Sequence, residues 1–242
     1  MTLLLLAGTT EAQRIAQVLA RQGISAVASL SGATHTPKPL GLPTRVGGFG
    51  GEAGFRACLA DLGITAVLDA THPFAADISH RTARVCAELG LPYCQVLRPE
   101  WRPEPGDDWV FLDHEDEAGQ HIPPGSTVFL ATGRQTLERF AGLSACHLIC
   151  RVVDPPEGPF PFPKGDFLVG RPPFQVESER ETFARLEVDW LVVKNAGGEA
   201  SRAKLTAARE LGVRVAMLNR PAQPDAECVE TVQAALDWVV GL

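Results

Sequence analysis

Hydrophobic residues occur in two alternating patterns along this chain. Short apolar runs, such as LLLLA at residues 3–7 and TAVLD at residues 65–69, are typical of strands buried on both faces. Between such runs, apolar residues recur with the spacing of one helix face, as Ile15, Val18 and Leu19 do. Strands that alternate with amphipathic helices predict a parallel sheet covered by helices on both faces.

The alternation occurs twice along the chain. In the first half we predict strands at residues 3–7, 25–30, 65–69 and 92–97, and helices at residues 9–22, 52–62 and 75–89. In the second half we predict strands at residues 128–131, 147–153, 190–194 and 213–218, and helices at residues 135–140, 179–186, 200–211 and 227–240. Residues 154–174, rich in proline and aromatic side chains, are interpreted as a long ordered loop or a flexible lid.

A linker separates the two halves. Residues 98–108 (RPEWRPEPGDD) contain three prolines and little periodicity. We therefore predict an α/β protein with two Rossmann-like parallel-sheet domains, residues 1–97 and 109–242, and an active site in the cleft between them.

Composition narrows the classes of function. The 22 Lys and Arg residues against 29 Asp and Glu residues give a net charge of −7, which argues against a nucleic-acid partner. No apolar run reaches the roughly 18 residues of a membrane span, and residues 1–7 lack a basic start, so we expect a cytoplasmic protein without a signal peptide. Six cysteines without CxxC spacing are expected to be buried apolar residues, and no metal site is expected.

The residues that follow the predicted strands are small, hydroxylated or cationic, and ligands bind at this end of parallel strands. After the first strand, GTTEA keeps only the first glycine of the dinucleotide fingerprint, with Thr10 and Gln13 at the other glycine positions. Thr9 or Thr10 could therefore simply cap a helix. The same residues could instead offer hydroxyl and N–H donors to a phosphate.

Two further segments bear on whether the chain binds a nucleotide, and on which one. VGGFGG at residues 46–51 is either a flexible loop or a place where backbone approaches a ligand closely. The second strand ends in SLSG at residues 29–32, without the carboxylate that binds the ribose of NAD, and His35, Lys38 and Arg45 follow. This favours NADP over NAD, although a serine-lined strand end can also be plain packing.

Two segments offer candidates for proton chemistry. In DATHPFA at residues 69–75, Asp69 and Thr71 could merely cap a helix, or His72 could titrate near neutral pH. In VVKNAGG at residues 192–198, Lys194 ends a buried strand. Its ammonium could reach solvent, or it could bind an anionic group or assist a proton step.

GTTEA, RVGGFGG, DATHPFA, ATGRQ and VVKNAGG, in this order and spacing, resemble the precorrin-6A reductases of cobalamin (vitamin B12) biosynthesis. The resemblance covers essentially the whole chain. It implies that NADPH supplies a hydride, and a proton is added, to reduce one double bond of precorrin-6A to give precorrin-6B. The family often has an arginine where this chain has Ala33, so the 2′-phosphate contact would come from elsewhere, such as Arg45 or the serine hydroxyls.

The resemblance also implies site residues. Those expected to contact the cofactor are Thr9, Thr10, Ser31, Gly32, Arg45, Gly47, Gly48, Phe49, Gly50, Thr71, His72 and Pro73. Those expected to bind the carboxylates of the tetrapyrrole are Arg134, Gln135, Arg151, Arg171, Lys194, Asn195 and Arg202. Lys194 and His72 are the candidates for a general acid, and solvent is an alternative.

Two other functions fit the same features. The first is an NADP-dependent reductase of a smaller substrate. The second is a two-lobed, non-enzymatic ligand-binding module.

Overall fold

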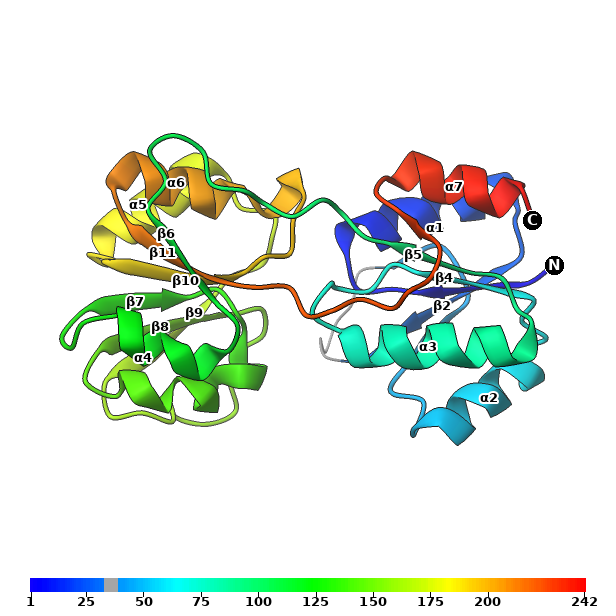
Figure 1. Cartoon of the computed structure of the whole chain (residues 1–242), viewed down its shortest axis with the longest axis horizontal. Coiled ribbons are helices and arrows are strands. Elements are labelled where there is room, and N and C mark those ends of the chain that lie inside the picture. Colours follow the sequence, from blue (N-terminus) through cyan, green and yellow to red (C-terminus); the bar gives the residue numbers. More distant parts are fainter. Residues whose placement is uncertain (33–38) are drawn as a thin grey trace. The chain divides into compact units, whose positions relative to one another are not determined.

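The computed structural model describes residues 1–32 and 39–242, which form two compact units. The first unit comprises Met1–Pro99 and Pro221–Leu242, and the second comprises Glu100–Arg220. Each unit contains one six-stranded sheet in which every neighbouring pair of strands is parallel, with helices beside it (Figure 1). The prediction of two Rossmann-like α/β sheets is confirmed.

The first sheet has the strand order of a dinucleotide-binding fold. Its strands are β1 (Leu3–Leu6), β2 (Ala26–Leu30), β3 (Thr44–Val46), β4 (Ala66–Asp69), β5 (Tyr93–Val96) and β12 (Cys228–Val229). They lie in the order β12-β5-β4-β1-β2-β3. From β1 the chain builds outward through β2 and β3, and it then returns to place β4 and β5 on the other side of β1. The strand order therefore reverses between β1 and β4, and this switch point is where such folds bind ligands.

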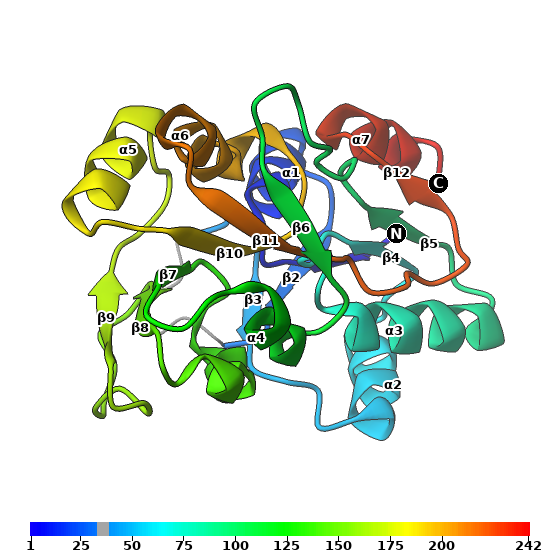
Figure 2. The same cartoon turned by 60° about the vertical axis from the view of Figure 1, so that its left-hand side comes forward.

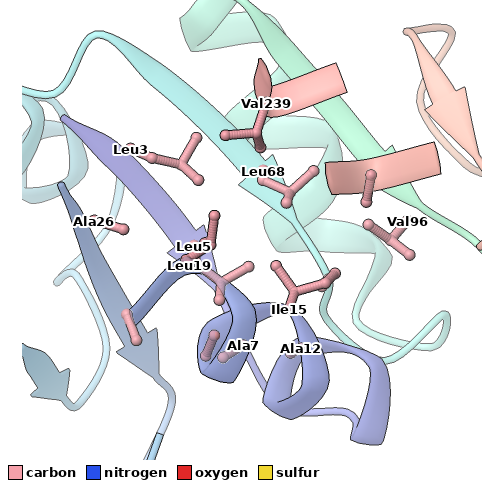
Figure 3. Close-up of a cluster of buried hydrophobic side chains, with 14 of the residues drawn as sticks. Leu3, Leu5, Ala7, Ala12, Ile15, Leu19, Ala26, Leu68, Val96 and Val239 are labelled. Carbon is pink, nitrogen blue, oxygen red and sulfur yellow. The ribbon is translucent and has the colours of Figure 1, made fainter. Parts of the chain in front are cut away.

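Helices cover both faces of the first sheet. The helices α1 (Thr10–Gln22) and α7 (Val232–Val240) lie on one face, and α2 (Glu52–Asp61) and α3 (Ala76–Leu89) lie on the other (Figure 1). All four leucines of β1 are buried because the strand is covered on both sides. Leu3 and Leu5 pack with Ile15 and Val239 (Figure 3), whereas Leu4 and Leu6 pack on the α2–α3 side.

The second sheet repeats this plan. Its strands are β6 (Trp109–Leu112), β7 (Thr127–Leu130), β8 (His147–Val152), β9 (Gly165–Val169), β10 (Trp190–Lys194) and β11 (Arg214–Leu218), in the order β6-β11-β10-β7-β8-β9 (Figure 2). The helical segments are η1 (Glu115–Glu117), α4 (Ala118–His121), η2 (Arg134–Leu143), α5 (Val176–Arg185), η3 (Glu199–Ser201) and α6 (Ala203–Leu211). Here the order reverses between β7 and β10, which makes a second switch point.

The domain boundaries differ from the prediction of residues 1–97 and 109–242. Pro221–Leu242 belongs to the first unit, because β12 pairs with β5 and α7 packs against α1. Residues 98–108 do not form a free linker either. Arg98 forms an ion pair with Glu11 in the first unit, and Trp101 is buried in the core of the second. Local periodicity cannot show which sheet a returning segment joins.

Short edge strands account for most other differences. The sequence patterns do not predict the strands β3, β6, β9 and β12, and β9 lies within residues 154–174, the segment interpreted as a long ordered loop or a flexible lid. The predicted last helix, residues 227–240, is divided into β12 and α7. In the part of the chain that the structure describes, no helix is long and apolar enough to cross a membrane.

Candidate active site

The loops after β1 and β4 meet at the first switch point. Thr9 caps α1: its Oγ1 accepts a hydrogen bond from the N–H of Ala12 at 3.1 Å and donates one to the carbonyl of Ala70 at 2.8 Å. The hydroxyl hydrogen of Thr9 is therefore used within the protein, and it is not the donor to a ligand that we expected. The first-turn N–H groups of α1, including that of the exposed Thr10, are the donors that a phosphate would use.

Asp69 organises the loop after β4. Its carboxylate is fully buried and accepts hydrogen bonds from the N–H of Thr71 at 3.0 Å, the hydroxyl of Thr71 at 2.7 Å and the hydroxyl of Tyr93 at 2.9 Å. Burial and the charge of Asp69 raise the pKa of Tyr93 above its usual range, so Tyr93 remains a hydrogen-bond donor. Asp69 and Thr71 thus hold the loop after β4, but they do not cap the next helix: the N-cap of α3 is Ala75, and no side chain caps it.

His72 lies partly exposed in this loop. Its Nδ1 accepts a hydrogen bond from the N–H of Phe74 at 3.2 Å, so the neutral ring carries its proton on Nε2. The neighbouring Pro73 is buried, and its carbonyl accepts a hydrogen bond from Nε2 of Gln223 at 3.0 Å. A residue of the returning C-terminal segment therefore fixes this loop, and no local sequence pattern indicates that contact.

Arg45, on β3, contacts both β2 and the glycine-rich loop at residues 46–51. Its guanidinium donates to Oγ of Ser29 at 2.8 Å and to the carbonyl of Gly48 at 3.0 Å. The same guanidinium lies 4.0 Å from the centroid of the Phe49 ring, which is cation–π distance. Arg45 therefore lies beside the end of β2, next to the strand end that lacks a carboxylate.

Backbone geometry explains part of the glycine-rich loop. Gly50 has φ of 71°, a conformation that favours glycine. Gly54, which is not among the predicted site residues, lets the backbone of α2 approach that of Phe49 closely. A Cβ at this position would lie 1.8 Å from the carbonyl oxygen of Phe49. A glycine inside a helical pattern was the available signal for this contact. Gly48 has open space around its Cα, and the structure gives no steric reason for a glycine there.

The remaining cofactor candidates lie nearby in the chain. Ser31 and Gly32 are exposed beyond the end of β2, and Gly47 follows β3. Ala33, His35 and Lys38 lie outside the described residues.

Lys194 ends β10 at the second switch point. Its side chain is partly buried, and burial lowers the pKa of its ammonium below the ordinary 10.5. The buried carboxylate of Glu115 opposes this decrease, whereas the charge of Arg139 adds to it. Glu115 and Arg139 form an ion pair at 3.3 Å. Lys194 therefore lies in a group of ionised side chains.

Asn195 has a structural explanation. Its Oδ1 accepts from the N–H of Trp101 at 2.9 Å, and its Nδ2 donates to the carbonyl of Trp101 at 3.1 Å. Asn195 is buried, and both polar atoms of its side chain are used. It anchors the segment that enters the second unit, so this structure does not present it to a substrate.

Most predicted substrate arginines have carboxylate partners. Arg151 forms a 2.5 Å ion pair with Glu179, with 10% and 1% of these side chains exposed. Arg171 pairs with Asp154, and Arg202 pairs with Glu104.

Arg134 and Gln135 behave differently from these paired arginines. Both are exposed at the start of η2, and Arg134 has no ion-pair partner within the described residues. Arg202, with Phe174 and Thr206, lines a cavity of about 300 Å³ within the second unit. Among the residues described, no group of three His, Cys, Asp or Glu side chains is placed to bind a metal.

The family model described as "Precorrin-6x reductase CbiJ/CobK" matches residues 2–240. The chain belongs to this precorrin-6x reductase family. It is 42% identical to the precorrin-6A reductase of Rhodobacter capsulatus over 238 residues, covering 98% of this chain and 95% of that protein. It is also 41% identical to the enzyme of the same name from Rhodococcus erythropolis, covering 98% and 96%. Among solved structures, a "CobK precorrin-6A reductase" matches with a TM-score of 0.96 and 41% identity, covering 100% of this chain and 96% of that one.

Membership in the precorrin-6x reductase family confirms the resemblance seen in the five motifs, and it confirms that the chain is an oxidoreductase. A non-enzymatic binding module is therefore not supported. The individual site residues of this family member, and the position of its active site between the two units, stay predictions.

Proposed function

We propose that the protein reduces precorrin-6A to precorrin-6B with NADPH as hydride donor. The observation that carries the cofactor proposal is Arg45, bonded to Ser29 at a strand end without a carboxylate. A carboxylate at this position would repel a 2′-phosphate, whereas a guanidinium attracts one. The substrate proposal rests on the names of the relatives that are 37–42% identical over nearly their full length.

The first unit offers two subsites for the nucleotide. The N-terminus of α1 has N–H groups and a positive dipole end that suit a pyrophosphate. Glu11 in the first turn would oppose such binding, but its charge is compensated by Arg98. Arg45 and Phe49, at the β2 and β3 side, suit the 2′-phosphate and its ribose.

Substrate carboxylates are proposed to bind in the second unit, first to Arg134 and Gln135. These side chains are exposed beside the second switch point. Arg151, Arg171 and Arg202 already pair with carboxylates, so binding by them would require an exchange of partners.

The reaction adds a hydride and a proton across one double bond, and bound NADPH supplies the hydride. We propose that Lys194 supplies the proton. Burial lowers the pKa of its ammonium, which makes it a stronger acid than an ordinary lysine. His72, whose Nε2 carries the proton in the neutral tautomer, is the second candidate.

The comparisons favour a substrate without cobalt. Relatives named precorrin-6A reductase are 37–42% identical to this chain, whereas those named cobalt-precorrin-6A reductase are 25–26% identical.

The direct test mixes the purified protein with precorrin-6A and NADPH under anaerobic conditions. We expect a fall in NADPH absorbance, a macrocycle that gains two hydrogen atoms in mass, and slower turnover with NADH. A macrocycle of unchanged mass would refute the proposed reaction. Equal rates with NADPH and NADH would refute the cofactor preference alone.

A further inference from the structure

Arg81 on α3 lacks a counter-ion in the described structure. Its guanidinium lies 5.9 Å from the centroid of the Phe49 ring and 5.8 Å from that of Phe55. Its Nε is buried and has no hydrogen-bond partner, and no carboxylate pairs with it within the described residues. A buried N–H without an acceptor costs free energy, so the described protein leaves the guanidinium of Arg81 incompletely satisfied.

A second unpaired cation lies on the same ring. Arg45 lies 4.0 Å from the Phe49 centroid, and its two hydrogen bonds go to an uncharged hydroxyl and an uncharged carbonyl. Two guanidinium groups thus lie near one phenyl ring, and no carboxylate among the described residues pairs with either. An anion that reached both groups would offset this local positive charge.

Neighbouring arginines show that this arrangement is local. Arg56 on α2 and Arg84 on α3 both pair with Glu52, and both also pair with Glu88. The same two helices therefore supply carboxylates to the arginines on their outer surface but not to Arg81. In a chain of net charge −7, a site with two unpaired cations is selective for an anion.

We propose that Arg81 is a second specificity-determining residue for the cofactor, and that it binds the 2′-phosphate of NADPH together with Arg45. This inference rests on the proposed function. The location supports a 2′-phosphate over the pyrophosphate. Arg45 reaches Ser29 at the end of β2, beside which dinucleotide folds place the ribose 2′ group, whereas the pyrophosphate belongs at the N-terminus of α1.

The test uses the full chain and two adenosine nucleotides that differ mainly at the 2′ position. Affinities for 2′,5′-ADP and 5′-AMP are measured by calorimetry for the wild type, Arg81→Met, Arg81→Lys and the matched control Arg84→Met. Methionine keeps apolar contact with Phe49 and Phe55 but removes the charge. We expect Arg81→Met to weaken 2′,5′-ADP about tenfold, to leave 5′-AMP within about twofold, and Arg81→Lys to recover part of the loss.

Arg84→Met should change neither affinity, and thermal unfolding checks that each variant is folded. An unchanged affinity of Arg81→Met for 2′,5′-ADP would overturn the inference. Equal weakening of both nucleotides would also overturn it, because Arg81 would then only support Phe49. If the wild type itself fails to prefer 2′,5′-ADP, the proposed cofactor is wrong; if it does and Arg81→Met keeps that preference, only the role of Arg81 is wrong.

Discussion

The two units have the same strand order around their switch points, but individual arginines in them differ in whether a carboxylate neutralises their charge. In the first unit, Arg45 and Arg81 lie on Phe49 without carboxylate partners in the described structure. In the second, Arg151 is neutralised by the almost fully buried Glu179, and Arg202 by Glu104. The comparison shows that topology alone does not make a cation available to a ligand. A cation is available to a ligand only where no carboxylate from a distant part of the sequence pairs with it.

The units also complete their sheets differently. The edge strand β12 of the first sheet comes from the C-terminal end of the chain, whereas the second sheet is completed by β6, which precedes its other strands. The returning segment does more than extend the sheet. The side-chain amide of Gln223 donates a hydrogen bond to the carbonyl of Pro73 and accepts one from the side chain of Gln95. It therefore links the loop after β4 to β5. The last segment of the chain thus fixes the loop after β4 at the first switch point.

The largest expected effect is a loss of stability when an arginine that is buried in an ion pair is replaced. Arg151→Met should lower the free energy of unfolding by about 3–5 kcal/mol, because Glu179 would be left buried without its partner. Urea denaturation measures this change, and the double variant Arg151→Met/Glu179→Leu should recover much of it. Arg171→Met is the control, since the Arg171 side chain is half-exposed and its pair with Asp154 should contribute less than about 1 kcal/mol. Equal stability losses in the two single variants would contradict the contrast.

The next effect concerns the proton donor. Lys194→Met should lower kcat about 100-fold while the affinity for NADPH stays within about twofold. In the wild type, the donor must be protonated, so kcat should fall as pH rises through its pKa, at a lower pH than for an ordinary lysine of pKa 10.5. Steady-state rates across the pH range test this, with the surface variant Lys164→Met as control. A kcat within twofold of the wild type would remove Lys194 from the mechanism.

A third prediction addresses the first unit. Arg45→Met should weaken NADPH binding about tenfold and leave NADH binding and the free energy of unfolding nearly unchanged, because the described hydrogen-bond acceptors of this guanidinium are an uncharged hydroxyl and an uncharged carbonyl. Fluorescence titration with both nucleotides measures the ratio of affinities. An unchanged ratio would show that the cations of the first unit do not read the 2′-phosphate.

The smallest effect comes from paired charges on the outer surface of the first unit. Hydrogen bonds from Arg84 and then Arg56 lower the pKa of Glu52 from 4.5 to about 2. A carboxyl with a depressed folded-state pKa contributes stability above its unfolded pKa and loses it as pH falls towards the folded value.

Glu52→Gln should therefore lower the melting temperature slightly at pH 7, and the difference from wild type should shrink below about pH 4.5 and in high salt. Glu138→Gln, which removes an exposed carboxylate of the second unit, is the control. A difference that grows on acidification would contradict this sign.

Local signals predicted the central strands and the major helices well. The cap at Thr9 could be predicted from residue type and position, because its hydroxyl accepts a hydrogen bond from the N–H of Ala12, only three positions later. The edge strands β3 and β12 are three and two residues long, too short to show a period. The role of Asn195 depends on Trp101, which lies 94 positions away, and no local pattern carries that contact. The sequence thus revealed which residues gather at the strand ends, but not which of them the protein already uses.

Hydrogen–deuterium exchange of the full chain with and without NADPH tests the central contrast most directly. If the nucleotide binds the first unit, NADPH should slow exchange in peptides covering residues 7–12 and 44–51 and leave residues 131–136 unchanged when no tetrapyrrole is present. Protection confined to residues 131–136 would contradict the assignment of the nucleotide to the first switch point.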